Sequence, residues 1–478
     1  MAVLDHLEPK NVFHFFEELC AIPHGSSNTK QISDWLMKFA EDRGLEAYQD
    51  ELNNVIIIKE ATSGYEEAPP VIIQGHIDMV CEKTADCEKD MEKEGLDLVV
   101  EGDTIYAKDT TLGGDDGIAV AMALAILDAD NLEHPRVEGV FTVDEEIGML
   151  GAAGLDVSML RGRRLLNVDC QEEGIFTVSC AGGVVAHCVF PLTRAPFEGT
   201  ALTVTVGGLA GGHSGTAIDR GGGNSNLLMG RVLYAAAQKA DLRLVRVAGG
   251  LKDNAIPRET VATIVTKDPE GVRNVCLELD AVLKNEYRVA DPDVFVTVAQ
   301  DTAEVPMDEE TTRTVICFMS TIPNGVVTMS AEISGLVQTS SNMGVLYTTD
   351  TELHSGSCVR SSVDSQKKML AERICCLAET LGAQVQMEGD YAGWEYRAES
   401  PLRDLLVEVY TEQIGQAPRI EAVHAGLECG VLISKLPGLD CVSLGPELTD
   451  IHTVQERLHI ASTQRLWELL LETLKRMK

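Results

Sequence analysis

Positively charged residues are scarce in this sequence. Its 478 residues include 39 lysines and arginines against 75 aspartates and glutamates, which gives a formal net charge of -36. A chain with this charge repels phosphate backbones and anionic membrane surfaces. We therefore expect neither a nucleic acid nor a membrane among its partners.

Long apolar runs and cysteine pairs are also missing. No run is long enough to span a bilayer, and residues 1–8 have neither a basic nor an apolar region of the kind found in signal peptides. The thirteen cysteines are scattered without a Cys-x-x-Cys spacing, so neither a disulfide framework nor a thiolate zinc site is predicted. We expect a cytoplasmic protein with reduced, buried thiols.

Three common signatures of active sites are absent. The sequence contains no Gly-x-Ser-x-Gly and no His-Glu-x-x-His, which mark serine hydrolases and zincins. The glycine-rich segment 207–215 is not followed by Gly-Lys-Ser or Gly-Lys-Thr, as a phosphate-binding loop would be. The chemistry must therefore be sought elsewhere in the chain.

The segment 71–80, Val-Ile-Ile-Gln-Gly-His-Ile-Asp-Met-Val, is the strongest positive signal. Its β-branched apolar run predicts a strand that is buried on both faces. The strand ends in His76 and Asp78, two side chains that can act at a metal site. Because ligands of open α/β sheets bind at the carboxyl ends of strands, we expect a functional site here.

Further acidic residues follow predicted strands or precede a predicted helix. They are Asp115 and Asp116 before the helical run 118–127, Asp144 to Glu146 after the strand 137–143, and Asp169 after the strand 165–168. Capping of the helix is the simpler explanation for Asp115 and Asp116 taken alone. Several such positions in one half of the chain favour a common site.

A second histidine, His452, lies in a loop after the predicted strand 441–446. The resulting set of nitrogen and oxygen ligands suits zinc, manganese or cobalt better than calcium. The predicted ligands are His76, Asp115, Glu146, Asp169 and His452. Five ligands exceed the needs of one catalytic zinc and predict two divalent ions that share a carboxylate. Glu145 is the candidate that takes a proton from water and passes it to the leaving amine.

The pattern changes between residues 186 and 385. Segments such as 202–206 and 326–333 alternate as antiparallel strands with one solvated face do, and 366–381 reads as an amphipathic helix. The length of the chain also indicates more than one core. We predict one domain formed by residues 1–185 and 386–478, interrupted by an inserted domain at 186–385.

Seven segments, in this order, resemble motifs of the aminoacyl-histidine dipeptidases, which are carnosinase-like cytosolic enzymes of the M20 metallopeptidase family. They are Gly75–Asp78, Gly113–Gly117, Asp144–Gly148, Asn167–Asp169, Gly211–Gly215, Asp253–Glu259 and His424–Gly430. The resemblance implies an α/β catalytic domain with a mixed, mainly parallel sheet flanked by helices. It also implies an inserted α+β lid domain that makes the contacts of a homodimer.

The resemblance assigns the metal ligands more closely. His76 and Asp169 would complete one site, Glu146 and His452 the other, and Asp115 rather than Asp116 would bridge them. Two zinc ions are implied, with manganese or cobalt as alternatives. Asp78 would orient His76, because histidine ligands generally need such a partner.

The resemblance also gives the inserted domain a role. His213 would approach the developing oxyanion, although it could instead only brace its own turn. Asn254, Arg360 and the backbone at Gly426 would hold the carboxylate end of a dipeptide. One departure concerns the segment 451–456, which lacks the proline expected soon after the last ligand histidine and so leaves the stiffness of this loop in question.

The implied function is hydrolysis of dipeptides, preferentially Xaa-His dipeptides such as carnosine, by a metal-activated water. One alternative is another M20 amidohydrolase, such as a tripeptidase or an N-acyl amino acid deacylase. A second alternative is a scaffold that has lost catalysis, but such a scaffold predicts missing ligands and all five are present. Substrate preference depends on pocket shape, which the sequence does not show.

Overall fold

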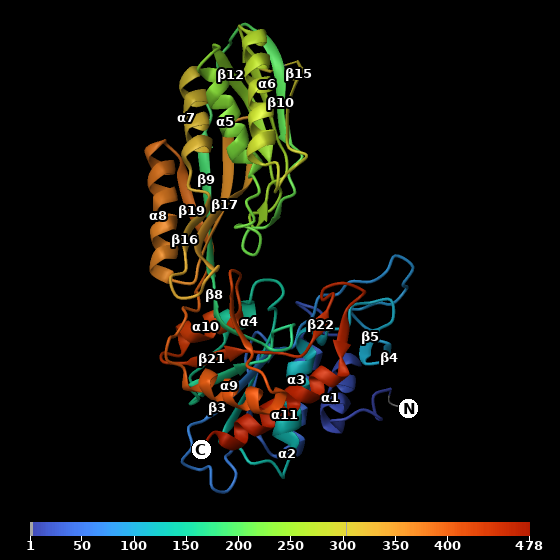
Figure 1. Cartoon of the computed structure of the whole chain (residues 1–478). Helices are drawn as coiled ribbons and strands as arrows, with labels where there is room; N and C mark the ends of the chain where they lie inside the picture. Colours follow the sequence, from blue (N-terminus) through green and yellow to red (C-terminus); the bar gives the residue numbers. More distant parts are fainter. Residues whose placement is uncertain (1–2, 303) are drawn as a thin grey trace. The chain divides into compact units, whose positions relative to one another are not determined.

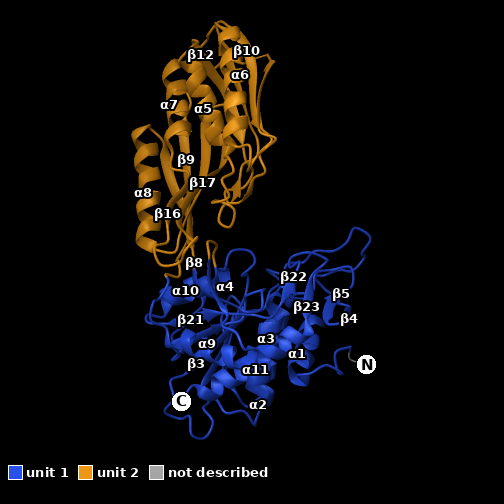
Figure 2. Cartoon of the chain, in the orientation of Figure 1, with its two compact units in different colours: residues 1–179, 396–422, 427–478 blue, residues 180–395, 423–426 orange. Residues whose placement is uncertain are grey.

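The computed structural model describes residues 3–302 and 304–478 (Figure 1). The chain forms two compact units, which are coloured separately in Figure 2. The first unit comprises residues 1–179, 396–422 and 427–478, and the second comprises residues 180–395 and 423–426. The second unit therefore interrupts the first in sequence.

The first unit is built on an eight-stranded mixed sheet. The strand order is β1 (Glu46–Gln49), β2 (Val55–Lys59), β6 (Val137–Thr142), β3 (Val71–His76), β7 (Arg164–Asn167), β21 (Asp440–Ser443), β8 (Ile175–Cys180) and β20 (Arg419–Val423). The central strands β6, β3, β7 and β21 pair in parallel, whereas β1, β2 and β6 pair antiparallel. The predicted fold class is confirmed, with parallel pairing at the centre of the sheet.

The central strands are apolar because both faces of the sheet are covered. All six residues of β3 are buried, as expected for a parallel strand between helices. The helices of this unit are α1 (Lys10–Cys20), α2 (Lys30–Arg43), α3 (Gly114–Asp128), α4 (Leu150–Gly154), α9 (Pro401–Ile414), α10 (Glu428–Lys435) and α11 (Ile460–Arg476). None of the helices in the described chain combines the length and apolar composition needed to cross a bilayer.

Helix α3 is the central helix of the first unit. It is apolar on every side, and its residues from Gly114 to Leu127 are buried, which is typical of a helix enclosed by other elements. It packs against α1 and against strands β3 and β6. This packing places the acidic start of α3 near the carboxyl end of β3.

A small four-stranded sheet also belongs to the first unit. Its order is β22 (Leu448–Thr449), β23 (Arg457–His459), β5 (Thr104–Ala107) and β4 (Leu98–Glu101). Strand β4 lies at the end of the acidic stretch 82–101. Its pairing partner β5 lies only three residues beyond it and forms a hairpin with it.

The second unit is built on a nine-stranded sheet whose strands pair antiparallel wherever the pairing is described. The order is β15 (Phe295–Gln300), β10 (Thr200–Gly207), β14 (Thr260–Thr266), β12 (Leu242–Gly249), β17 (Val337–Thr348), β18 (Glu352–Ser361), β9 (Gly182–Pro191) and β19 (Gln384–Tyr391), with β16 (Gly325–Met329) beside β17. Helices α5 (Ser225–Ala237), α6 (Pro269–Glu286), α7 (Glu309–Thr321) and α8 (Asp364–Thr380) line one side of this sheet in Figure 1. A two-stranded ribbon, β11 (Gly212–His213) and β13 (Ala255–Ile256), completes the unit.

The limits of the second unit differ from the predicted range 186–385. The unit starts at residue 180 and ends at residue 395, because β9 and β19 pair with each other and belong to its sheet over their full lengths. Residues 423–426 also belong to it, since the backbone N–H of Ala181 donates to the carbonyl oxygens of Val423 and Ala425. These pairings join residues that are far apart in sequence, so local patterning did not reveal them.

Candidate metal centre and catalytic residues

The parallel pairing of the central strands brings the predicted ligands to one edge of the first sheet. His76 at the end of β3 is in register with Thr142 at the end of β6, and Gln74 of β3 is in register with Asn167 at the end of β7. The residues that follow these strands therefore emerge at the same edge. They include Glu145, Glu146 and Asp169.

Asp115 lies between the two predicted histidine ligands. Its Oδ1 is 3.2 Å from Nε2 of His76, and its Oδ2 is 3.3 Å from Nε2 of His452. Nε2 of His452 is also 2.8 Å from Oε1 of Glu146. One carboxylate thus faces both imidazoles, each with a different oxygen.

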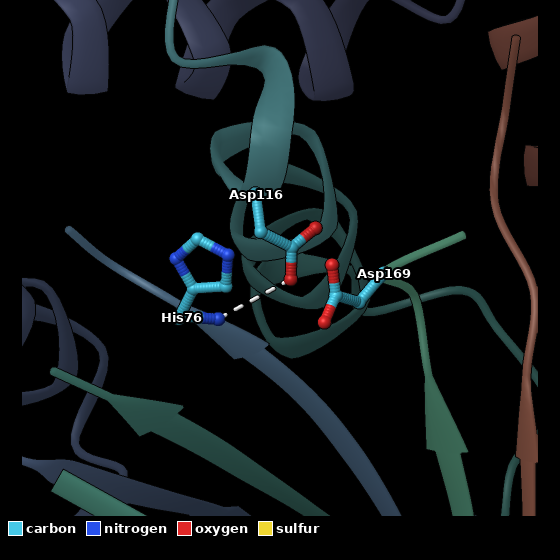
Figure 3. A group of neighbouring side chains, drawn as sticks. All are labelled: His76, Asp116 and Asp169. Atoms are coloured by element: carbon cyan, nitrogen blue, oxygen red, sulfur yellow. Dashed lines mark hydrogen bonds between the residues drawn. The ribbon is translucent and has the colours of Figure 1, made fainter. Parts of the chain in front are cut away.

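Asp116 also lies beside His76, as Figure 3 shows. The backbone N–H of His76 donates to Oδ2 of Asp116 at 3.2 Å, and the carboxylates of Asp116 and Asp169 face each other. Ligand atoms of His76, Asp116 and Asp169 all lie within 4.8 Å of one another. Asp116 was not in the predicted site, although it is part of the paired acids that drew attention to this segment.

Asp78 connects His76 with the loop after β6. Nδ1 of His76 lies 2.9 Å from the carbonyl oxygen of Asp78 and 3.5 Å from its Oδ1. The backbone N–H of Glu145 donates to Oδ1 of Asp78 at 3.1 Å, and the hydroxyl of Ser26 donates to its Oδ2 at 2.8 Å. Asp78 therefore orients the imidazole so that Nε2 faces Asp115, and it positions Glu145 at the same time.

Glu145 and Glu146 have different surroundings despite being adjacent. Glu146 contacts His452, whereas no hydrogen bond holds the Glu145 carboxylate within residues 3–302 and 304–478. Burial raises the pKa of Glu145 to about 8, and the nearby charges of Glu428 and Glu146 act in the same direction, against the opposing effect of His76. A carboxylate in such a place binds a proton readily and is free to pass it on.

The cluster as a whole is short of positive charge. Its acids are Asp115, Asp116, Glu145, Glu146 and Asp169. In the described parts of the chain, no lysine or arginine forms an ion pair with any of them, and two imidazoles are the nearest basic groups. Buried carboxylates are costly unless a cation or hydrogen-bond donors compensate them.

The pKa shifts reflect the same shortage. Burial raises the pKa of Asp116 and of Asp169 well above the usual range, and neighbouring carboxylates add to the effect. Hydrogen bonds to Asp115 and Glu146 raise the pKa of His452 to about 10. Burial opposes a charged Asp115, but contacts with His452 and His76 outweigh it and lower the pKa of this acid. Divalent cations fit this donor set, because their charge would replace the protons that the acids otherwise retain.

Glu456 supports the loop that carries Asp115, and the sequence analysis did not identify it. Helix α3 has Gly113 as its N-cap, and no side chain caps it. The backbone N–H groups of Leu112, Gly113, Gly114 and Asp115 instead donate to the buried carboxylate of Glu456. The capping explanation for Asp115 and Asp116 is therefore wrong. Glu456, near the C-terminus, accepts the N–H groups at the start of α3.

A buried polar network lies next to the cluster, around Gln74, which precedes His76 by two residues in β3. Gln74 and Thr142 donate to Oε2 of Glu428 at 2.5 and 2.7 Å, and Asn167 donates to Oε1 of Gln74 at 2.7 Å. Burial raises the pKa of Glu428 to about 7. Because side chains two residues apart in a strand share a face, Gln74 supports the same face as His76. The motif 424–430 contained Glu428, but nothing local in the sequence indicated this role.

His213 and Arg360 form a separate cluster in the second unit. The backbone N–H groups of Gly215 and Thr216 each donate to Nδ1 of His213 at 3.3 Å, and Nη2 of Arg360 lies 3.4 Å from Nε2. Burial lowers the pKa of His213, and Arg360 lowers it further. Backbone N–H groups of its own turn and the guanidinium of Arg360 therefore surround His213, which is a neutral imidazole.

Asn254 and Arg360 are held near this turn. The backbone N–H of Ser214 donates to the carbonyl oxygen of Asn254 at 2.8 Å, and the Asn254 residue itself is exposed. Arg360 is buried, and its Nη1 donates to the hydroxyl of Tyr391 at 3.0 Å. The second unit thus presents a buried guanidinium beside His213.

Gly426 lies two residues after His424, the first residue of the motif 424–430. His424 is buried, and its Nε2 lies 2.7 Å from Oγ of Ser340, the register partner of Arg360. Burial lowers the pKa of His424 to about 4, with Arg360 adding to the effect. Its carbonyl oxygen would lie 2.1 Å from a Cβ at position 215, so only glycine fits there. Position 424 therefore packs directly on the loop of His213.

The structure groups the predicted residues by unit. His76, Asp78, Asp115, Glu145, Glu146, Asp169 and His452 lie in the first unit, and His213, Asn254, Arg360 and Gly426 lie in the second. The overlapping groups of potential metal ligands all contain residues of the first unit. The individual roles assigned to these residues stay predictions.

Comparison with known proteins identifies the family. Residues 72–476 match the sequence profile of peptidase family M20/M25/M40. The chain belongs to this peptidase family. It is 37% identical to the cytosol non-specific dipeptidase of Escherichia coli K12 over 99% of both sequences. The predicted M20 membership is confirmed.

Solved structures agree with this assignment. The M20 chain matches the crystal structure of aminoacylhistidine dipeptidase from Vibrio alginolyticus with a TM-score of 0.93 and 34% identity, covering 99% of this chain and 97% of that one. A tripeptidase from Staphylococcus aureus matches with a TM-score of 0.57 and 15% identity over 98% and 99% of the two chains. The second likeness shows a shared fold alone.

Proposed function

We propose that this M20 peptidase is a dipeptidase that cleaves Xaa-His dipeptides such as carnosine and depends on two divalent metal ions. The observation that carries the proposal is the position of Asp115, which faces His76 at 3.2 Å and His452 at 3.3 Å within one acidic cluster. A carboxylate shared between two ligand sets is the arrangement that a metal pair requires. Glu145 belongs to the same cluster, with a carboxylate oxygen within 4.8 Å of ligand atoms of His76 and Glu146.

The substrate class follows from the relatives and stays open in its detail. The Escherichia coli relative is named a non-specific dipeptidase, and the Vibrio alginolyticus protein an aminoacylhistidine dipeptidase. Both names favour a dipeptide over a tripeptide or an N-acyl amino acid. The buried Arg360 supports this reading, because a guanidinium in a pocket suits the free carboxylate of a short peptide.

Two ligand sets would hold the metal ions. The family resemblance would give one ion His76, Asp115 and Asp169, and the other Asp115, Glu146 and His452. In the structure, ligand atoms of Asp115, Glu146 and His452 lie together, and those of His76 and Asp169 lie together with Asp116. Bound ions of this kind polarise a peptide carbonyl and make hydroxide available near neutral pH. We propose zinc for both positions, with manganese or cobalt as alternatives, because the donors are imidazole nitrogens and carboxylate oxygens.

Glu145 would move the proton during hydrolysis. Its carboxylate would take a proton from the attacking water and hand it to the nitrogen of the leaving amine. Asp78 keeps Glu145 in place through the backbone N–H of Glu145. His213 would donate a hydrogen bond from its imidazole N–H to the developing oxyanion.

We further propose that the enzyme works in the cytoplasm as a homodimer whose contacts lie in the second unit. The name of the Escherichia coli relative supports the location. The family resemblance of the sequence motifs supports the dimer. A small peptide is the proposed partner of the active site.

Substrate turnover tests the proposal directly. Carnosine, Gly-His, a dipeptide without histidine, a tripeptide and an N-acetyl amino acid should be compared on one preparation at equal metal loading. We expect the highest kcat/KM for the histidine dipeptides and little turnover of the last two. Preferential cleavage of the tripeptide or the N-acetyl amino acid would replace the proposal by one of the alternatives.

The metal content of the protein should be two divalent ions per chain. The expectation rests on two ligand sets that share Asp115. Elemental analysis after saturation with zinc and removal of free metal measures it. A plateau at one ion per chain would contradict the dinuclear proposal.

Glu145→Gln should lower kcat by about 100-fold or more, because the amide cannot carry the proton. The metal content should stay at the wild-type level, since Glu145 is proposed to act without binding the ions. Glu146→Gln is the matched control at the adjacent position, and it should weaken metal binding because Glu146 contacts His452. Equal loss of metal in both variants would make Glu145 a ligand.

His213→Ala should lower kcat by roughly 100-fold, the size expected for the loss of one oxyanion donor. Metal content should not change, because His213 lies in the second unit. His354→Ala is a suitable control, since His354 also lies in this unit and pairs with Glu352 instead. A lower midpoint of thermal unfolding with near-normal kcat would reduce His213 to a brace of its own turn.

The same variant tests the proposed dimer. Chains with His213→Ala and chains with Glu145→Gln are each expected to be inactive, so a mixture regains activity only when two chains complement each other. Partial recovery after subunit exchange would show that a partner supplies the His213 loop. No recovery after verified exchange would assign the loop to the same chain.

A further inference from the structure

We infer that Glu456 is a positioning residue whose carboxylate fixes the loop of Asp115 to the segment of His452 and thereby sets the metal affinity of the site. The inference rests on the proposed role of Asp115 and His452 as ligands. It concerns a residue that is not itself within the candidate ligand groups. Its evidence is the hydrogen bonding of one buried side chain.

Glu456 uses both of its oxygens on one short loop. Oε2 accepts the backbone N–H groups of Leu112 and Gly113 at 2.7 and 3.2 Å. Oε1 accepts those of Gly114 and Asp115 at 2.8 and 3.4 Å. The residue is 3% exposed, so water does not compete for these bonds.

The loop before α3 needs these hydrogen bonds because its own backbone offers few acceptors for its N–H groups. The first N–H groups of a helix have no partner within the helix, and they carry its positive partial charge. Gly113 has a left-handed backbone, and Asp115 and Asp116 have non-helical φ and ψ angles. A carboxylate that accepts four N–H groups compensates the missing helical bonds and is a strong, charge-assisted acceptor.

The packing around Gly114 shows how closely the two segments approach. A Cβ at position 114 would lie 2.7 Å from Cδ2 of Leu448 and 3.2 Å from Oε1 of Glu456. No side chain fits between them without a shift. The loop before α3 therefore rests directly on the C-terminal segment.

The backbone of Glu456 is hydrogen-bonded within the turn that contains His452. The backbone N–H of Glu456 donates to the carbonyl oxygen of Thr453 at 3.1 Å, and the hydroxyl of Thr453 donates to the carbonyl oxygen of Asp450 at 2.7 Å. His452 has a φ of 60°, a left-handed conformation that a non-glycine residue adopts only when its surroundings impose it. Hydrogen bonds within the segment 450–456 thus connect Glu456 with the turn that holds His452.

One side chain thus joins two proposed ligands that are more than 300 residues apart in sequence. Groups that orient metal ligands commonly change metal affinity by about 10- to 100-fold when they are replaced. Glu456 orients the backbone of Asp115 instead of its carboxylate. The distance between Asp115 and His452 should depend on it.

Glu456→Gln is the test, because the amide keeps the size but turns an NH2 group toward backbone N–H donors. The dissociation constant for Zn²⁺, measured by competition with a chromogenic chelator, should rise by about 10-fold or more. Excess Zn²⁺ should restore part of the dipeptidase activity. Glu456→Asp keeps the negative charge on a shorter side chain. Its dissociation constant for Zn²⁺ should lie between those of Glu456→Gln and the wild type.

Glu138→Gln is the matched control. Glu138 is also a buried carboxylate that accepts backbone N–H groups, from Arg161 and Gly162, but it lies near the start of β6, and the ligands follow the end of that strand. The substitution Glu138→Gln should lower the midpoint of thermal unfolding without changing the Zn²⁺ dissociation constant. This control separates positioning of the site from general stability.

The outcomes distinguish the inference from the proposed function. Wild-type Zn²⁺ affinity in Glu456→Gln, together with weakened binding in Asp115→Asn, would overturn the inference alone. Wild-type protein that binds no Zn²⁺ would overturn both. If Glu456→Gln does not fold, wild-type Zn²⁺ affinity in Glu456→Asp would still overturn the inference, and a raised dissociation constant would support it.

Discussion

Buried negative charge at the carboxyl edge of the first sheet is the constraint on which the site depends. Five carboxylates converge there: Glu145, Glu146 and Asp169 follow the ends of the parallel strands β6 and β7, and Asp115 and Asp116 begin helix α3. Charge buried without compensation is costly. Two imidazoles compensate part of it, and the remainder is what divalent cations would supply.

Three buried glutamates of the first unit show three ways to meet this constraint. Glu138 pairs with Arg136 and accepts backbone N–H groups, and Glu456 relies on backbone N–H groups alone. Glu428 accepts hydrogen bonds from Gln74 and Thr142, and burial raises its pKa to about 7 against the effect of these bonds. Cationic side chains compensate acids away from the cluster, whereas neutral donors support the acids near it. In the part of the chain that the structure describes, the acids of the cluster therefore form no ion pair with a lysine or arginine.

The second unit shows the opposite electrostatics around His213. Arg360 is the buried charge there, and its presence helps to keep His213 and His424 neutral. A guanidinium can bind a carboxylate, and a neutral imidazole can donate a hydrogen bond to an oxyanion.

The sequence by itself determined the class of the fold and most of the proposed ligands, because strand periodicity and the acidic strand ends are local patterns. His76 and Asp169 were found in this way, and the family motifs added the choice of Asp115. Only the tertiary structure showed Asp116 beside Asp169, and Glu456 beneath Asp115. It also decided the limits of the second unit, through the pairing of β9 with β19. These features depend on contacts between residues far apart in the chain, and local periodicity carries no information about which distant groups will meet.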